Sequence, residues 1–244
     1  MATLTPADYA DTGQWRLLIK IKPDGMSAHL ENTLHEGVEP LLMFESKWDA
    51  EDDAFLKKVE NAVYEHPRVL DDFATKIILY DKKTLFMPTQ VAEEEEGNEE
   101  KIYTSLYPGE NEDIMIDTDR DITAVYNLGK GLKSFLLRTF PGARISSNLM
   151  DALKNVRKIN QGLSIYIFKR DGESDYIFLD GSNLISASTH FTDTDVDTLY
   201  HAFNILDAYG YAAPDVKIEW KGIKPGEEVS NILKLNKNNS ASQE

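Results

Sequence analysis

Two runs of alternating aspartates are the first candidates for metal chemistry. They comprise Asp193, Asp195 and Asp197 in one run, and Asp117, Asp119 and Asp121 in the other. This spacing opens the calcium loop of EF-hands, which also needs glycine at its sixth position and glutamate at its twelfth. Those positions hold Thr198 and Asn204 in one run, and Ile122 and Leu128 in the other. We therefore predict no metal site, but a helix cap at the first run and a turn at the second.

Other catalytic motifs are absent from the sequence. His190 and His201 lie eleven residues apart, which matches no metal motif, and we interpret His201 as a residue at a helix surface or core edge. The chain has no cysteine, which excludes thiolate nucleophiles and cysteine-ligated zinc or iron–sulfur sites. It contains no G-x-S-x-G, HExxH, P-loop or G-x-G-x-x-G motif. We assign no catalytic residue and no metal ligand.

Acidic residues crowd one short segment, Gln90–Leu106. They are Glu93, Glu94, Glu95, Glu96, Glu99 and Glu100. A charge run of this kind is most often a solvated helix or loop. The same carboxylates could also dock a basic partner protein. Both interpretations stay open at this point.

Composition limits the classes of partner. The formal net charge is -16, and such an acid excess opposes binding to phosphate backbones, so we expect no nucleic acid partner. No apolar run approaches the length of a membrane-spanning helix. The first fourteen residues lack the basic and apolar regions of a secretory signal. We predict a cytoplasmic protein.

The stretch Gly162–Gly222 predicts one α/β block. Asp171-Gly172 and Asp180-Gly181 separate three apolar runs, and Asp-Gly between such runs is a strong hairpin signal. A helical pattern follows over Thr194–Tyr209, and Val216–Trp220 resembles a further strand. The predicted order is therefore three antiparallel strands, a helix and a fourth strand.

The stretch Trp15–Tyr80 repeats this order without repeating the residues. Strands are predicted at Trp15–Ile21, Met26–Glu31, Pro40–Phe44 and Lys76–Tyr80, with a helix at Asp49–His66. Connections between a strand, a helix and a parallel strand are short and right-handed. Two βββαβ units of this kind are typical of two ribonuclease-H-like halves.

The region between the two blocks has its own predicted elements. Strands are expected at Thr84–Met87, Asp113–Ile116, Ile122–Tyr126 and Ala143–Ser147, with helices at Lys130–Phe140 and Leu149–Ile159. The predicted organisation is a flexible lead-in (1–14), a first half with an acidic connecting region (15–160), a second half (161–235) and a disordered tail (236–244).

The sequence resembles an uncharacterised family of Bacteroidetes proteins, a domain of unknown function with an actin-like ATPase fold. The stretches that carry the resemblance are LLIKIKPDGMSAHL, TLFMPTQVAEEEE, FLLRTFPGARIS, and the block from LSIYIF to HFTDTDVDTLYHAFNIL. The resemblance covers roughly residues 15–222 and includes the actin-like proteins of type IV pilus assembly among the relatives. It implies an α/β protein of two ribonuclease-H-like halves. After VKIEWKG the fold usually adds more helix and strand, so we expect a short last layer here.

An active member of this fold would hold ATP and Mg²⁺ through an acid near the end of the first strand of each half. Lys20, Ile21 and Lys22 end the first strand of one half, and Ile165–Lys169 forms that strand in the other. Neither position offers an acid, and the glycine pair expected near the last strand is reduced to Gly222. The nucleotide elements are therefore degenerate, and no cofactor is assigned.

The basic residues near these strand ends give one hypothesis about the cleft of the fold. They are Lys20, Lys22, Lys169 and Arg170. Together they could hold an anion, or each could be solvated. The function that fits best is a non-catalytic scaffold or protein-interaction module. The alternative is an atypical nucleotide-binding ATPase of the actin-like superfamily.

Overall fold

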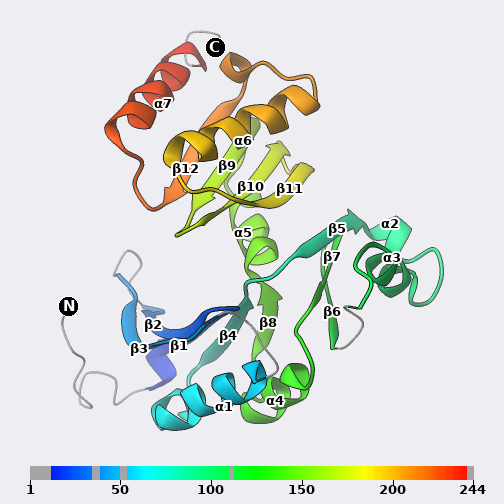
Figure 1. The fold of residues 1–244 in the computed structure, drawn as a ribbon, viewed down its shortest axis with the longest axis vertical. Helices are drawn as coiled ribbons and strands as arrows, with labels where there is room; N and C mark the ends of the chain where they lie inside the picture. Colours follow the sequence, from blue (N-terminus) through cyan, green and yellow to red (C-terminus); the bar gives the residue numbers. More distant parts are fainter. Residues whose placement is uncertain (1–11, 35–38, 50–53, 110–112, 241–244) are drawn as a thin grey trace. The chain divides into compact units, whose positions relative to one another are not determined.

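Figure 1 shows the computed structural model of the chain. The structure describes residues 12–34, 39–49, 54–109 and 113–240. Contacts divide the chain into a first unit that ends at Asp151 and a second unit that begins at Ala152. The division falls inside helix α5 (Asn148–Arg157), earlier than the boundary predicted after residue 160. Each unit has its own sheet, and the two are described separately.

The first unit is organised around a five-stranded sheet of order β3-β2-β1-β4-β8. Its strands are β1 (Trp15–Lys22), β2 (Gly25–Asn32), β3 (Leu41–Lys47), β4 (Thr75–Tyr80) and β8 (Arg144–Ser147). The pairs β1–β2 and β2–β3 are antiparallel, whereas β1–β4 and β4–β8 are parallel. Leu17, Ile19 and Ile21 of the central strand β1 are fully buried, which anchors the sheet in the core.

Two helices pack on one face of this sheet (Figure 1), α1 (Phe55–Glu65) and α4 (Leu132–Thr139). Their apolar stripes join the strands in one core, to which Phe55, Val59, Val63, Phe135 and Leu136 contribute. The start predicted for the first helix lies partly at residues 50–53, outside the described residues. Short 3₁₀ turns lie at Thr12–Gln14 and Pro67–Leu70, and the second follows α1 directly.

A small three-stranded sheet of order β5-β7-β6 extends the first unit. It contains β5 (Thr84–Pro88), β6 (Ile114–Asp119) and β7 (Ile122–Asn127), with the helices α2 (Thr89–Ala92) and α3 (Asn98–Leu106). Met87, Ala92, Tyr103 and Val125 form a separate core for this part. The acidic segment therefore packs against this small sheet. Most of its glutamates lie in the link between α2 and α3.

The second unit has a four-stranded sheet of order β11-β10-β9-β12. Its elements are β9 (Leu163–Lys169), β10 (Glu173–Asp180), β11 (Asn183–Phe191), α6 (Asp195–Ala208), the 3₁₀ turn Ala213–Asp215, β12 (Lys217–Gly222) and α7 (Glu227–Ser240). The strands β9, β10 and β11 form an antiparallel meander, and β12 is parallel to β9. Residues from α6, α7 and the sheet share one core.

The order β1-β2-β3-α1-β4 of the first unit recurs as β9-β10-β11-α6-β12 in the second. The predicted pair of βββαβ units is confirmed, including the parallel pairing of the first and fourth strands. After Gly222 the chain adds one helix and no described strand, which agrees with the short last layer that was expected. The predicted disorder over residues 236–244 is wrong for residues 236–240, and residues 241–244 lie outside the described residues. Helix α7 adds a layer after Gly222, with Val229 and Leu233 buried, and it extends to Ser240, into the segment predicted to be disordered. None of the described helices is long and apolar enough to cross a membrane.

Candidate functional site

Lys20 and Lys22 lie on β1 of the first unit, with both side chains partly exposed. They are two positions apart, so they project from the same face of the strand. On the neighbouring strand β2, burial lowers the pKa of His29, and the positive charge of Lys20 lowers it further. This half of the predicted anion site therefore carries two cations on one strand.

The turn beside these lysines is built for packing. Trp48 closes it, because its indole Nε1 donates to the carbonyl oxygen of Pro23 (2.9 Å) and its backbone N–H donates to that of Asp24 (3.0 Å). Glycine is required at Gly25, because a Cβ atom there would lie 2.7 Å from the carbonyl oxygen of Ser46. The Asp-Gly pair of the first hairpin therefore fits the close approach of β2 and β3.

Lys169 lies at the end of β9 in the second unit and is only 6% exposed. Its Nζ donates to the backbone carbonyl of Thr192 (2.7 Å) and to the Thr192 hydroxyl (2.9 Å). That hydroxyl also contacts Ser174 Oγ (2.8 Å), which contacts Thr198 Oγ1 (3.2 Å). Thr198 Oγ1 donates to the carbonyl of Thr194 (3.0 Å). The lysine thus belongs to a polar network that joins β9 and β10 to the start of α6.

Arg170 is held by carboxylates of its own hairpin. Its Nη2 lies 2.9 Å from Asp175 Oδ1 and 3.3 Å from Glu173 Oε2. Asp175 is buried and accepts a further hydrogen bond from Thr189 Oγ1 (2.6 Å). The charge of this arginine is therefore balanced inside the second unit. An anion at Lys169 and Arg170 would have to compete with these contacts.

The aspartate run before α6 is a helix cap, as predicted. Thr194 Oγ1 accepts from the N–H of Asp197 (3.1 Å), and Asp197 Oδ2 accepts from the N–H of Thr194 (3.1 Å). Asp195 Oδ2 accepts from the N–H of Gly226 (2.7 Å), which ties the loop before α7 to the start of α6. Asp195 and Asp197 therefore stabilise the start of α6 and the loop before α7.

The other aspartate run crosses the β6–β7 turn, as predicted. Asp117 Oδ2 accepts from Ser146 Oγ on β8 (2.6 Å), and Arg120 takes a positive φ of 57° in the turn. The described residues contain no cluster of three or more metal-ligating side chains. The hydrogen bonds of Asp197 in the first run belong to a helix cap, and in the second run Asp117 bonds to Ser146 on β8.

His190 and His201 stack with ring centroids 4.6 Å apart. Tyr176 meets the His190 ring edge-on at 5.5 Å, and Ser188 Oγ lies 3.1 Å from His190 Nε2. Burial, followed by the neighbouring His201, lowers the pKa of His190. The hydroxyl of Tyr176 donates to the carbonyl of Thr198 (2.9 Å), so the cluster packs β10 and β11 on α6. The histidines are packing residues at a core edge.

The first unit carries a pocket that we name the acidic hollow, with a volume of about 320 Å³. It is lined by Ala92, Glu93, Glu95, Glu96, Gly97, Glu99, Ile116, Thr118 and Thr123. Its floor is hydroxyl-bearing, because the buried Thr123 Oγ1 lies 3.2 Å from Thr118 Oγ1 and 3.1 Å from Thr89 Oγ1. The lining residues of the sheet come from β6 and β7, and the carboxylates come from the α2–α3 link and the start of α3.

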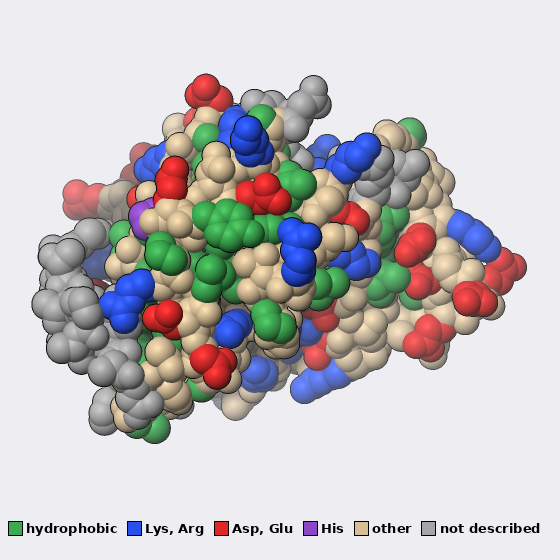
Figure 2. Space-filling view, turned by 90° about the horizontal axis from the view of Figure 1, so that it is seen from below, with side chains coloured by type: hydrophobic (Ala, Val, Ile, Leu, Met, Phe, Trp, Pro, Cys, Tyr) green, Lys and Arg blue, Asp and Glu red, His purple; other side chains and the backbone are tan. Residues whose placement is uncertain are grey.

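Four of the six glutamates predicted to dock a partner line the acidic hollow. The other two, Glu94 and Glu100, are exposed beside it. Figure 2 shows acidic side chains gathered at the side of the first unit that carries α2 and α3. One lysine, Lys101, forms an exposed ion pair with Glu95 (3.2 Å). The structure thus turns part of the acidic segment into a concave surface, which the sequence did not predict.

The polar network of Lys169 was also missed by sequence reasoning. Its partner Thr192 lies 23 residues further along the chain, with two strands between them. No local pattern around Lys169 reports such a contact. A lysine next to Asp-Gly usually marks a solvated hairpin end, whereas this one is buried.

Comparisons with solved structures show the fold. A Bacteroides thetaiotaomicron protein of unknown function with an actin-like ATPase fold matches with a TM-score of 0.71 and 15% identity, over 94% of this chain and 90% of that one. The Ppx/GppA phosphatase of Aquifex aeolicus gives a TM-score of 0.38 at 8% identity, over 90% of this chain and 60% of that one. The PilM–PilN type IV pilus biogenesis complex gives 0.37 at 9% identity, over 81% and 66%.

The first of these matches shows that the chain has the actin-like ATPase fold. No curated protein matches the sequence. A family model described as a protein of unknown function, DUF3822, matches residues 6–235. With nearly the whole length matched, the chain belongs to the DUF3822 family.

Proposed function

We propose that this protein is a non-catalytic scaffold that binds a basic segment of a partner protein at the acidic hollow. The observation that carries the proposal is the hollow itself, where Glu93, Glu95, Glu96 and Glu99 surround a concave surface of about 320 Å³. Carboxylates placed around one concavity attract lysine and arginine side chains and steer their approach. The net charge of -16 adds to this attraction.

The position of the hollow beside β6 favours an extended partner. Among the described strands, β6 pairs with β7 alone and forms an edge of the small sheet. Ile116 and Thr118 of β6 line the hollow, and Ile116 is 40% exposed. A partner strand along β6 would place alternate side chains over the hollow. Basic side chains at those positions would meet the glutamates.

The strand ends that would hold phosphate in this fold support a non-catalytic role. Ile21 is fully buried at the end of β1, and Lys169 at the end of β9 donates to Thr192. Arg170 is paired with Asp175. Neither Lys20–Lys22 at the end of β1 nor Ile165–Lys169 of β9 includes a carboxylate that could orient a magnesium ion or its waters.

A labelled peptide of alternating lysine and valine tests the acidic hollow directly. We expect fluorescence anisotropy to show binding that weakens with added salt, because exposed ion pairs are screened. Replacing Glu93, Glu95, Glu96 and Glu99 with glutamine should weaken binding by about tenfold or more. The matched control replaces Glu39, Glu65, Asp207 and Asp215, all exposed elsewhere, with their amides.

Equal binding to the two amide variants would show that only the overall charge matters, and the proposal would fail. Cross-linking in cell extract then extends the test to natural partners. Proteins that bind through the hollow should be captured by the unchanged chain and by the control variant, and lost with the glutamine variant. A capture pattern identical for all three proteins would also contradict a partner site at the hollow.

The competing function is that of an atypical nucleotide-binding ATPase, which the actin-like ATPase fold favours. Binding of Mg-ATP should raise the free energy of unfolding by RT ln(1 + [L]/Kd), about 2.7 kcal/mol at a hundredfold excess over Kd. We expect no thermal shift at about millimolar Mg-ATP, a concentration far above a typical nucleotide Kd. A clear shift accompanied by phosphate release would replace the scaffold with the ATPase.

A further inference from the structure

The two repeats differ at the sheet edge beyond their fourth strand. In the first unit, β8 lies parallel to β4 and continues the sheet. In the second unit, β12 holds the place of β4, and no described strand lies beyond it. Helix α7 follows β12 and packs into the core, as α4 does before β8. The second repeat therefore has every element of the first sheet except the fifth strand.

Hydrogen bonds fix which residues of the two repeats correspond. The N–H of Asp81 donates to the carbonyl of Ile21 (2.9 Å), just after β4. The N–H of Ile223 donates to the carbonyl of Lys169 (3.1 Å), just after β12. Asp81 therefore corresponds to Ile223, and Ile21 corresponds to Lys169. Counting back along the fourth strand, Ile78 corresponds to Trp220.

This pair of residues shows what the missing strand would cover. Ile78 is fully buried, and its partner on β8 is Ile145. Trp220 packs partly on the second core but remains partly exposed. Its ring is anchored, because Nε1 donates to the carbonyl of Ile223 (2.7 Å). A residue in the place of Ile145 would cover the exposed part of this tryptophan.

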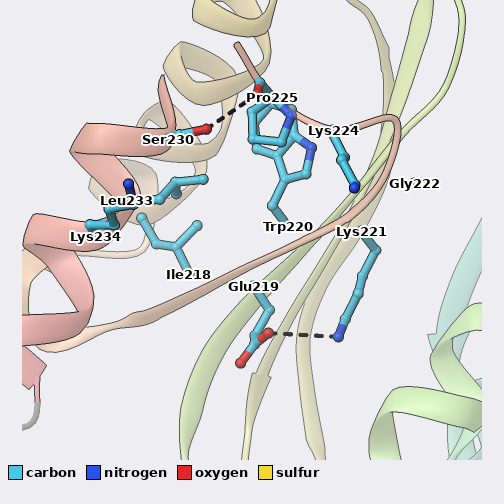
Figure 3. A pocket seen from close by; sticks show the side chains of 10 residues that line it. All are labelled: Ile218, Glu219, Trp220, Lys221, Gly222, Lys224, Pro225, Ser230, Leu233 and Lys234. Carbon is cyan, nitrogen blue, oxygen red and sulfur yellow. Dashed lines mark hydrogen bonds and ion pairs between the residues drawn. The ribbon is translucent and has the colours of Figure 1, made fainter. Parts of the chain in front are cut away.

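A pocket that we name the basic hollow lies at this position, with a volume of about 490 Å³. It is lined by Ile218, Glu219, Trp220, Lys221, Gly222, Lys224, Pro225, Ser230, Leu233 and Lys234. Figure 3 shows Ile218 and Trp220 of β12 facing Leu233 of α7, while Glu219 and Lys221 lie on the other side of the strand. The hollow thus has an apolar floor between β12 and α7.

The charges around the basic hollow are mostly positive. Lys221 and Lys217 are both paired with Glu219, at 3.7 Å and 2.6 Å. Lys224, in the loop after β12, and Lys234, on α7, have no ion pair or hydrogen bond with any described residue. A ligand in the hollow would therefore gain from carboxylates that reach these two lysines.

We propose that β12 accepts an acidic, extended segment of a partner protein as the fifth, parallel strand of the second sheet. Main-chain hydrogen bonds to β12 would supply affinity, as in strand addition to an open sheet edge. An apolar side chain of that segment packs on Trp220 and Leu233, in the way that Ile145 packs beside Ile78. Its acidic neighbours pair with Lys224 and Lys234. This surface belongs to the second unit and is independent of the acidic hollow.

The test uses a labelled ten-residue peptide of alternating glutamate and isoleucine. Fluorescence anisotropy should show saturable binding, and hydrogen exchange should slow over residues 217–222. The Lys224→Glu/Lys234→Glu variant should bind about tenfold more weakly, because attraction becomes repulsion. The Lys57→Glu/Lys158→Glu variant is the matched control, since both of those lysines are exposed elsewhere. A peptide with proline at alternate positions should not bind, because it lacks the required N–H donors.

Three outcomes would overturn the proposal. The first is the absence of binding at about millimolar peptide. The second is protection at β11 or β6 instead of β12, or equal binding of the proline peptide. The third is concentration-dependent protection of β12 without peptide, which would show that a second copy of this chain occupies the edge. The glutamine variant of the acidic hollow should bind this acidic peptide unchanged or more tightly, so the two proposals fail separately.

Discussion

The first strand of each repeat ends at corresponding residues, Ile21 in the first unit and Lys169 in the second. Ile21 is fully buried in an apolar core. Lys169 is almost as buried, yet its ammonium group donates to Thr192 and joins a chain of hydroxyls that reaches α6. One fold position is thus stabilised by hydrophobic packing in one unit and by hydrogen bonds in the other.

The last residues of the fourth strands differ as sharply. Tyr80 ends β4 and is fully buried, whereas its counterpart Gly222 ends β12 with φ at +82°. A Cβ atom at Gly222 would lie 2.2 Å from the carbonyl oxygen of Lys169. The lone glycine that resembles a remnant of a nucleotide motif is therefore required by close strand packing. The comparison teaches that corresponding backbone positions of the two units hold different residue types, and that Ile21, Tyr80, Lys169 and Gly222 each serve packing or hydrogen bonding within their own unit.

Exchanging the residue types at the first-strand end should produce the largest effect. Ile21→Lys places an ammonium group in a cluster of buried apolar side chains, whereas the counterpart Lys169 donates to Thr192. We expect a loss of about 4 kcal/mol in the free energy of unfolding. Ile21→Met keeps the volume and should cost less than about 1.5 kcal/mol. Urea unfolding followed by circular dichroism measures both, and equal costs for the two variants would refute the interpretation.

Gly222→Ala should rank second, because it combines a strained backbone with a steric clash. Gly172→Ala is the matched control in the same unit, since its φ is +71° but nothing lies within 4 Å of an added Cβ. Backbone strain alone costs about 1 kcal/mol, so the control should lose about that much. The clash should bring Gly222→Ala to about 3 kcal/mol. Similar losses in the two variants would show that β9 and β12 separate easily.

Much of the fold was predictable because its signals are local. Asp-Gly turns between apolar runs predicted the hairpins, and Thr194 with Asp197 predicted the cap of α6. Helix α7 was not predicted because its apolar residues Val229 and Leu233 stand in a polar segment and form no recognisable helical pattern there. Their role is visible only in the structure, where both pack into the core of the second unit. The strand β8 was predicted as an element, but its parallel place beside β4 depends on long-range pairing.

The candidate sites were less predictable, since they depend on contacts between distant segments. The charge of Glu93–Glu96 was visible, but the concavity arises from Ile116 and Thr118 on β6. The open edge of β12 becomes recognisable only when the two sheets are compared. The proposed anion site at Lys20, Lys22, Lys169 and Arg170 assumed four exposed cations. Within the second unit, two of them are engaged with Thr192 and Asp175 instead.

The helix starts of the two repeats should respond differently to capping changes. Thr194→Ala removes the side-chain cap of α6 and should cost about 1 kcal/mol. The counterpart α1 begins after Ala54, whose φ of -92° and ψ of 2° are not the extended conformation of an N-cap. Ala54→Ser should therefore change the free energy of unfolding by less than about 0.5 kcal/mol. A stabilisation near 1 kcal/mol would show that α1 can gain a cap.

The smallest expected effect is a pH dependence of the second unit. Because burial and His201 lower the pKa of His190 below its ordinary 6.5, the unfolded chain binds a proton more readily than the folded one. The stability contributed by neutral His190 is present above pH 6.5 and is lost as the pH falls through the lower, folded-state pKa. His190→Phe keeps a ring against His201 and Tyr176 but removes the titration. Urea unfolding at about pH 7.5 and about pH 5.5, on either side of the ordinary histidine pKa, should show a smaller difference in the free energy of unfolding for the variant than for the unchanged chain.

His29→Phe is the control in the first unit, where burial and Lys20 lower the pKa of His29. It should reduce the pH dependence of the stability of the first unit instead. An unchanged pH slope in His190→Phe would show that the stacked pair accepts a proton without loss of packing.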